Sequence, residues 1–372
     1  MTVNRRELVA FLAGLPLMLQ SGGTVAAAPS EKAGLRARAA AKGLDYGCAV
    51  QFGLLQKDQA LVAAIKNECS IVVPEFEMKW GSIEHVRGTR NYEQADGLVA
   101  FARANGLKVR GHTAAWANNL PPWAPDVLRS DEGARVFDSH LRDVFSHFKG
   151  QLAEWDVVNE AVQPRDRRPG GLRNSILFRA FGAGFIDKAF NVAAEIDSKA
   201  LLFYNDAGLE YAGADIDMRR LSTLKLLERL KTSGVPVHGL GIESHLEAGG
   251  AAFDAKVFRT FLRDVADLGL KIRITELDIN DRALDGDIAT RDRAVADMAR
   301  RYLDATLDEK AVSGVLTWGL TDRYTWLNMG EHRWRRADKQ PNRCLPLDAD
   351  LQRKPFWFAL AAAFDGAPDR RR

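Results

Sequence analysis

Eight short apolar runs, separated by segments with helical spacing, constrain the fold more than any other feature. The runs cover residues 46–52, 70–73, 108–113, 154–159, 200–205, 237–244, 270–276 and 313–319. Leucines recur every three residues between 221 and 230, and Gly234 ends that pattern as a helix stop signal. Continuously apolar strands that alternate with helices are typical of a parallel sheet buried on both faces. Eight such units predict an α/β fold, a single closed (β/α)₈ TIM barrel.

Length and composition agree with one soluble domain. The chain has 372 residues, 46% of them hydrophobic and 27% charged, which suits a single large barrel. The formal charge is only +3, so the composition does not favour a nucleic-acid partner. No linker or low-complexity segment divides the mature chain. We therefore expect one catalytic barrel domain over residues 29–372, acting as a monomer.

The first residues have a different pattern. Arg5 and Arg6 precede a short apolar run and a small-residue stretch that ends at Ala28. This layout predicts an export signal over residues 1–28, and the arginine pair favours the twin-arginine route over an ordinary secretory signal. The apolar run is too short to span a bilayer. We expect an exported protein, periplasmic or extracellular, with no membrane contact after signal removal.

The cysteines and histidines indicate neither a metal nor a cofactor. Cys48, Cys69 and Cys344 match no metal motif. Cys48 and Cys69 lie on neighbouring predicted strands, which would allow a disulfide, but buried free thiols are the favoured interpretation. The chain has no His-Glu-x-x-His pair and no phosphate-binding glycine loop. We expect no metal and no organic cofactor.

Two glutamates stand at predicted strand ends. A (β/α)₈ barrel carries its catalytic groups at the C-terminal ends of its strands. Glu160 follows the fourth run and Glu276 closes the seventh. A carboxylate at the end of a buried strand is costly unless it is paired, hydrated or used. Two of them, each within a polar and aromatic cluster, favour glycoside hydrolysis, in which one carboxyl protonates the leaving oxygen and the other attacks or activates water.

The sequence around these glutamates resembles a known family. "WDVVNEAV" ends at residue 162 and "ITELDI" ends at residue 279. Further blocks follow the same order: "PEFEMKW" at 74–80, "RGHTAAW" at 110–116, "YND" at 204–206, "GLGIESHL" at 239–246, "WGLTDRYTW" at 318–326 and "PLDADLQRKP" at 346–355. From about residue 44 to about 364 the chain is similar to glycoside hydrolase family 10, whose known members are mainly endo-β-1,4-xylanases.

The resemblance implies roles for individual residues. Glu160 would be the acid/base and Glu276 the nucleophile of a retaining, double-displacement hydrolysis of internal bonds in xylan or xylo-oligosaccharides. Asn159 would bond a sugar hydroxyl, while His245 and Asp278 would orient the nucleophile. The implied substrate-binding residues are Glu75, Lys79, His112, Trp116, Tyr204, Trp318 and Trp326. Among the other tryptophans, Trp155 is predicted to fill the core, and Trp80, Trp123, Trp334 and Trp357 are left open.

Four positions depart from the family pattern. Phe76 and Ala117 replace the usual Asn and His, Asn119 stands where Gln is common, and Glu243 replaces the Gln before "SHL". We expect weaker glycone binding from these changes. Two alternatives remain open: a related barrel glycosidase acting on another β-linked glycan such as mannan or glucan, and a catalytically weak xylan-binding protein.

Two loops are rich in arginine. "QPRDRRPGGLR" at 163–173 follows Glu160 directly, and "EHRWRRADKQPNR" occupies 331–343. One hypothesis is that the first loop contacts acidic glucuronosyl groups on the aglycone side. For both loops the favoured interpretation is a solvated segment whose charges serve solubility.

Overall fold

A computed structural model describes residues 33–250, 253–329 and 332–371. The export signal predicted over residues 1–28 lies outside these ranges. Among the helices within them, none is both long and apolar enough to cross a membrane.

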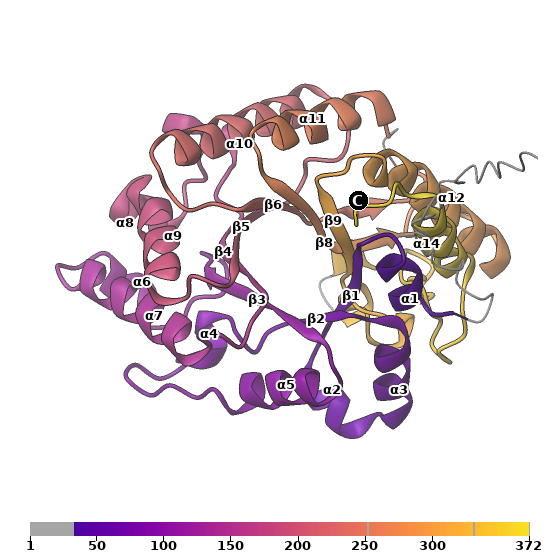
Figure 1. The fold of residues 1–372 in the computed structure, drawn as a ribbon, viewed down its shortest axis with the longest axis horizontal. Coiled ribbons are helices and arrows are strands. Elements are labelled where there is room, and N and C mark those ends of the chain that lie inside the picture. Colours follow the sequence, from indigo (N-terminus) through magenta and orange to yellow (C-terminus); the bar gives the residue numbers. More distant parts are fainter. Residues whose placement is uncertain (1–32, 251–252, 330–331, 372) are drawn as a thin grey trace, which may run out of the picture.

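Parallel strands form a closed ring at the centre of the molecule (Figure 1). The strands are β1 (Asp45–Val50), β2 (Ile71–Pro74), β3 (Lys108–Ala115), β4 (Glu154–Asn159), β5 (Leu201–Asp206), β6 (Gly239–Ile242), β7 (His245–Glu247), β8 (Lys271–Asn280) and β9 (Val312–Thr317). Pairing of β6 with β8 closes the ring, and the short β7 pairs only with the far end of β8. The predicted (β/α)₈ barrel is confirmed, and each of the eight apolar runs contributes one strand to its wall.

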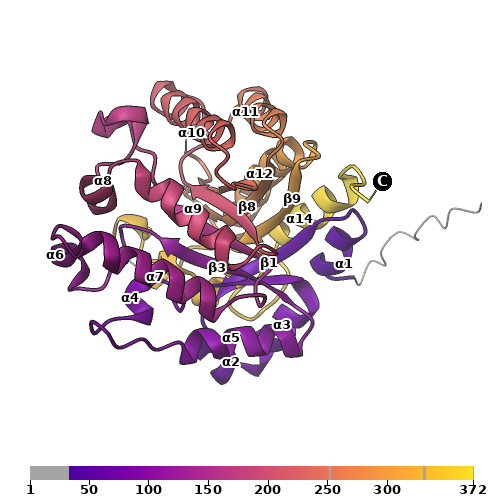
Figure 2. The ribbon, with the colours of Figure 1, turned by 60° about the vertical axis from the view of Figure 1, so that its left-hand side comes forward.

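Helices surround the strands on all sides (Figures 1 and 2). They are α1 (Leu35–Ala40), α2 (Phe52–Lys57), α3 (Gln59–Glu68), α4 (Trp80–Ile83), α5 (Glu93–Ala104), α6 (Ala124–Leu128), α7 (Gly133–His147), α8 (Ile176–Phe181), α9 (Gly184–Ile196), α10 (Ala214–Thr232), α11 (Ala255–Asp267), α12 (Ile288–Leu307), α13 (Trp326–Met329) and α14 (Pro355–Gly366). The leucine repeat lies in α10. Gly234 follows it with φ 71°, a left-handed conformation that glycine adopts without steric cost.

The first and last helices of the described chain lie together on one side of the barrel. The last helix, α14, packs against both α1 and α12 (Figure 2). Arg370 then donates hydrogen bonds to the carbonyls of Val312 at 2.8 Å and Leu307 at 2.7 Å. These contacts join the end of the domain to its last strand and so complete the outer layer.

The barrel interior contains a buried ionic layer that apolar periodicity did not reveal. Arg110 on β3 is fully buried, pairs with Asp156 and donates to Glu154 at 2.7 Å, both on β4. Arg273 on β8 donates to the other oxygen of Glu154 at 2.9 Å. Because an unpaired charge is expensive in such a place, each ion is compensated by a partner on a neighbouring element or across the barrel.

Aromatic and sulfur-containing side chains fill the space between strands and helices. Trp155 is 1% exposed, which confirms its predicted core role. Gly111 makes room for it, since a Cβ there would lie 2.3 Å from the indole ring. The three cysteines are buried and free, and the Sγ atoms of Cys48 and Cys69 are 3.7 Å apart. A disulfide needs about 2.03–2.05 Å, so the interpretation as free thiols is confirmed.

Candidate active site

A cavity of about 500 Å³ opens at the C-terminal ends of the barrel strands. Its lining residues are Glu75, Phe76, Lys79, His112, Trp116, Asn118, Asn159, Glu160, Arg173, Glu243, His245, Glu276, Trp318, Trp326 and Arg333. The predicted residues therefore meet in one place, apart from Asp278, which lies directly behind His245, and Tyr204. Another hollow of about 540 Å³ lies on the outer helix layer between α10 and α11, and no strand residue lines it.

Glu160 leaves the end of β4 in an unusual backbone conformation. Its φ is 53°, in the left-handed region that non-glycine residues rarely adopt, and its N–H donates to the carbonyl of Asn205 at 2.9 Å. Asn118 and Arg173 each contact its Oε2 at 3.3 Å. Burial and the negative charge of Asp206 raise the pKa of Glu160, against the opposing effect of Arg173. This carboxyl is suited to holding a proton.

Glu276 on β8 has the opposite electrostatic setting. It is 5% exposed, accepts a hydrogen bond from the Asn205 amide at 3.0 Å and lies 3.3 Å from Nε2 of His245. Burial alone would raise the pKa of Glu276, but the hydrogen bond from His245 and nearby positive charge lower it below the ordinary value. The carboxylate is therefore held in its ionised form.

A chain of polar contacts fixes His245 on β7. The indole N–H of Trp326 donates to Asp278 at 2.7 Å, and the other Asp278 oxygen lies 3.0 Å from Nδ1 of His245. Burial opposes the charged form of His245, yet Asp278 and Glu276 raise its pKa well above the usual value. The imidazolium ring is thereby oriented with Nε2 towards Glu276. Trp326 also lies against the ring, with centroids 5.3 Å apart.

Asn205 on β5 is a site residue that the sequence analysis missed. It is fully buried and donates both to Oδ1 of Asn159 at 2.8 Å and to Glu276. Its own Oδ1 accepts from the Thr275 hydroxyl at 2.8 Å. Gly241 allows this arrangement, because a Cβ there would lie 2.1 Å from Asn205 Oδ1. The "YND" block at 204–206 contained this residue, but the sequence analysis selected Tyr204 from it instead of Asn205.

The substrate-binding role predicted for Tyr204 is wrong. Its side chain is fully buried and does not line the cavity. The hydroxyl donates to Asp206 and accepts from the Ala161 N–H at 3.1 Å, so it holds the loop after Glu160. Side chains alternate along a strand, and Tyr204 points away from the face that Asn205 presents to the site.

Aromatic rings surround the amine of Lys79 in the cavity. Its Nζ lies 4.8 Å from the ring centroids of both Trp116 and Phe76, and 5.7 Å from that of Trp318. Burial lowers the pKa of Lys79, against the effect of the surrounding glutamates. Glu75 is also buried, and its pKa is raised to about 7, although a hydrogen bond from Gln51 at 3.1 Å favours the ionised form.

The four departures from the family pattern differ in their positions. Phe76 and Glu243 line the cavity, whereas Ala117 and Asn119 are not among its lining residues. The Asn119 carbonyl instead accepts from the Gly81 N–H at 3.0 Å, and Asn118 is the residue that reaches Glu160. Burial and the charges of Glu276 and Glu160 raise the pKa of Glu243 well above the ordinary value.

Both arginine-rich loops contribute to the cavity. Arg173 from the first loop donates through Nε to the Glu160 carbonyl at 2.7 Å, while Arg165 pairs with Asp215 on α10. The second loop carries Arg333 into the lining and places Trp334 against Trp326, with ring centroids 5.5 Å apart.

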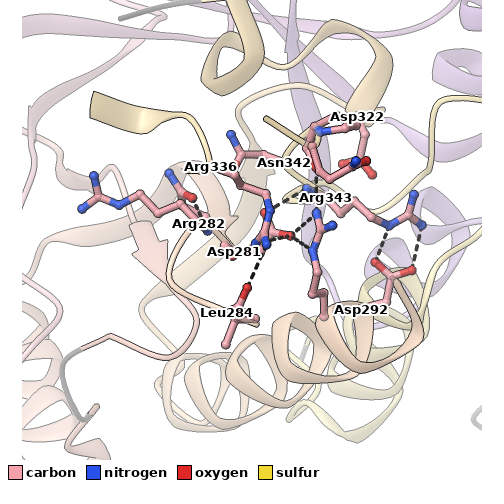
Figure 3. Close-up of polar contacts among 12 residues, drawn as sticks. Asp281, Arg282, Leu284, Asp292, Asp322, Arg336, Asn342 and Arg343 are labelled. Carbon is pink, nitrogen blue, oxygen red and sulfur yellow. Dashed lines mark hydrogen bonds and ion pairs between the residues drawn. The ribbon is translucent and has the colours of Figure 1, made fainter. Parts of the chain in front are cut away.

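A buried ionic network anchors this second loop to the end of β8 (Figure 3). Asp281 is fully buried and accepts from Arg291 at 2.7 Å, while its carbonyl accepts from Arg336. Arg343 pairs with Asp292 on α12 at 2.8 and 2.7 Å. These arginines therefore hold the loop in place rather than serve as free surface charge.

The remaining tryptophans that the sequence left open lie away from the cavity lining. Trp80 is 3% exposed and stacks on His140, with ring centroids 3.9 Å apart, and Trp123 packs edge-on against it. Trp357 is buried on α14, and its N–H donates to Glu68 at 3.0 Å. These three side chains pack against the hydrophobic core and do not line this cavity.

Comparison with known proteins gives a consistent result. Residues 34–363 match the family described as glycosyl hydrolase family 10. The chain is 33% identical over 351 residues to endo-1,4-beta-xylanase B of Thermotoga neapolitana, covering 93% of this chain and 96% of the relative. It is 35% identical over 272 residues to a beta-1,4-xylanase of Dictyoglomus thermophilum, covering 71% and 74%.

Solved structures resemble the fold over nearly the same span. Native xylanase 10B from Thermotoga maritima superposes with a TM-score of 0.79 at 32% identity, covering 89% of this chain and 98% of that one. Xylanase 10B from Thermotoga petrophila RKU-1, in complex with xylobiose, gives a TM-score of 0.79 at 32% identity, covering 91% and 98%.

Proposed function

Because this chain belongs to glycosyl hydrolase family 10, we propose that it is an endo-1,4-β-xylanase that cleaves internal bonds of xylan with retention of configuration. The observation that carries the mechanism is a pair of glutamates facing one cavity, with pKa values displaced in opposite directions. A retaining glycosidase needs one protonated and one ionised carboxyl, about 5–5.5 Å apart across the scissile bond.

Glu160 is proposed as the acid/base. Its raised pKa keeps a proton available for the leaving oxygen when the glycosidic bond breaks. In the second step the same carboxylate takes a proton from the attacking water. Arg173 and Asn118, both 3.3 Å from Oε2, hold the side chain in the cleft during this exchange.

Glu276 is proposed as the nucleophile. Its ionised carboxylate attacks the anomeric carbon, the bond to the leaving oxygen breaks, and a covalent glycosyl-enzyme forms. Asn205 and His245 each hold one oxygen of the carboxylate, so attack requires little reorientation. Asn205 also engages Oδ1 of Asn159 and so leaves the Asn159 amide NH₂ directed to a sugar hydroxyl.

The remaining lining residues are proposed to bind the sugar chain. Trp318 and Trp326 offer ring faces of the kind on which pyranose rings stack. Glu75, Lys79 and His112 supply charged and polar groups for hydroxyls within the same cavity. Phe76, 43% exposed at the cavity, replaces hydrogen-bonding capacity with an apolar face. We expect weaker binding on the glycone side than an amide at that position would give.

The deciding experiment is reducing-sugar release from β-1,4-xylan, mannan and cellulose by wild type and by Glu276→Ala. We expect release from xylan, reduced by about 10⁴-fold or more in the variant. The control is Glu195→Gln, which should retain activity. Glu195 is an exposed residue on α9 that forms an ion pair with Arg142 on α7. Preferred release from mannan or cellulose would refute the substrate assignment. Xylan binding without release would identify a carbohydrate-binding protein.

Trapping with a 2-fluoroxyloside that carries a good leaving group tests retention directly. The fluorine slows hydrolysis of the glycosyl-enzyme, so mass spectrometry of a protease digest should find the sugar on the peptide that contains Glu276. Absence of any labelled peptide from an enzyme active on xylan would contradict the double displacement.

We also propose that the protein is exported by the twin-arginine route, on the evidence of the pattern in residues 1–28. Replacement of Arg5 and Arg6 by lysine should retain the unprocessed protein in the cytoplasm, as measured by cell fractionation. Normal export of this variant would contradict the twin-arginine route.

A further inference from the structure

Three side chains from neighbouring strands direct ligand atoms to one point, and one of the three is the proposed nucleophile. They are Glu243, which follows β6, His245 on β7 and Glu276 on β8, and one ligand atom from each lies within 4.8 Å of the others. Nε2 of His245 lies 3.3 Å from Glu276 Oε2 and 3.9 Å from Glu243 Oε2. The proposed reaction assigns no step to Glu243.

These separations suit a tetrahedral transition metal. Zinc binds imidazole nitrogen and carboxylate oxygen at about 2.0–2.2 Å, which places neighbouring ligand atoms about 3.3–3.5 Å apart. The pair formed by His245 and Glu276 already has this spacing. Glu243 lies farther out, with its Oε2 3.9 Å from Nε2 of His245 and all three ligand atoms within 4.8 Å of one another, so its side chain would need to move inward to bind the same ion. All three residues line the cavity, so a water molecule from it would supply the fourth ligand.

The outer contacts of His245 are those expected behind a metal ligand. Metal-binding histidines usually hold the second ring nitrogen against a carboxylate, which fixes the ring and raises its basicity. Nδ1 of His245 lies 3.0 Å from Asp278, and Trp326 holds that aspartate from its other side. The His245 side chain is 27% exposed, so a cation can reach Nε2 through the cavity.

We propose that Glu243, His245 and Glu276 form a binding site for Zn²⁺ and that occupation of this site inhibits the enzyme. The bound cation would engage the lone pairs of Glu276, which are then no longer free to attack the anomeric carbon. Zinc must compete with protons for the three groups, because metal ligands bind in deprotonated form. The site is inhibitory and is not a cofactor site, so it does not alter the proposed hydrolysis.

Glu243 is the residue that turns a histidine–carboxylate pair into a three-ligand set. A glutamine at this position would offer only a neutral amide oxygen, a weaker ligand than a carboxylate. Glu243→Gln therefore preserves the shape of the side chain and removes the ligand. Glu195→Gln on α9 makes the same chemical change at an exposed position and is the matched control.

The test measures zinc binding and inhibition separately. Calorimetric titration with zinc chloride should give one site on wild type and on Glu195→Gln, and an affinity at least about 10-fold weaker on Glu243→Gln. Thermal unfolding without metal establishes that the variant is folded. Magnesium chloride is the control cation, and it should bind poorly because it prefers octahedral oxygen ligands.

In the activity assay, zinc chloride should inhibit xylan hydrolysis by wild type, and a chelator should restore it. The inhibition constant, measured against each variant's own basal rate, should rise on Glu243→Gln by the same factor as the dissociation constant. Equal zinc affinity in wild type and Glu243→Gln would overturn the site. The inhibition rests on the proposed role of Glu276. If zinc binding depends on Glu243 but does not inhibit, both the proposed inhibition and the proposed role of Glu276 as nucleophile are overturned. The proposal that the protein hydrolyses xylan would still stand.

Discussion

Replacement of Glu75 by glutamine should make the folded protein more stable at neutral and alkaline pH. Glu75 follows β2, is 7% exposed and accepts a hydrogen bond from Gln51. Burial raises its pKa from 4.5 to about 7. The folded protein therefore keeps a proton on Glu75 at pH values where the unfolded chain has released it. Glutamine has the same shape and never ionises.

The sign and size follow from proton linkage. Below pH 4.5, Glu75 is protonated in both states and contributes no pH dependence. Between pH 4.5 and about 7 the unfolded chain binds fewer protons than the folded protein, so stability falls as the pH rises. At about 1.36 kcal/mol for each pH unit, the loss reaches about 3 kcal/mol above pH 7. Glu75→Gln should escape this loss.

Urea unfolding of wild type and Glu75→Gln, measured across this pH range, tests the reasoning. The quantity of interest is the difference between their free energies of unfolding, because the titration of other groups largely cancels in it. We expect a difference that grows with pH between 4.5 and about 7 and is then constant. Glu228→Gln on α10 controls for the chemical change itself. A difference that does not change with pH would refute the assignment of the raised pKa to Glu75.

Further outcomes follow from the same structure. Glu160→Ala should slow the hydrolysis of xylan by about 10²–10⁴-fold, and the hydrolysis of aryl xylosides with good leaving groups much less, as measured by steady-state kinetics. Equal losses of rate on the two substrates would contradict an acid role. Arg173→Met removes a positive charge that lowers the pKa of Glu160, so the pH at which kcat/KM falls on the alkaline side should rise. An unchanged or lower pH for this fall would contradict the effect of Arg173 on Glu160. Arg110→Met leaves Glu154 and Asp156 with less compensation in the barrel and should cost about 3–5 kcal/mol in urea unfolding; a loss below about 1 kcal/mol would argue against the buried network.

The order of strands and the positions of the two glutamates could be predicted without coordinates. Alternation of apolar runs with helical spacing has few solutions other than a barrel, and parallel strands present their C-terminal ends on one face. Glu160 and Glu276 were therefore expected on the same side of the molecule. The resemblance between blocks extended this to most of the cavity lining.

Residues that act through long-range contacts were harder to predict. Asn205 contacts Asn159 on β4 and Glu276 on β8 at once. Its neighbour Tyr204 was selected instead because a three-residue block does not reveal which side chain faces the cavity. The ionic layer around Arg110 was hidden within runs that read as apolar. The arginine-rich loop over 331–343 was predicted to be solvated, but its Arg336 is buried, with only 6% of its surface exposed.

The local pattern of apolar and polar residues by itself predicted the fold class and the strand ends, since these depend on which residue types follow one another. The kind of chemistry was predicted from the resemblance of the sequence blocks to a known family. The protonation states of Glu160, Glu243 and Glu276, and the shared point to which Glu243 and His245 are directed, were decided only by the tertiary structure. Each depends on burial and on charges supplied by other strands, and those distances exist only after the barrel has closed.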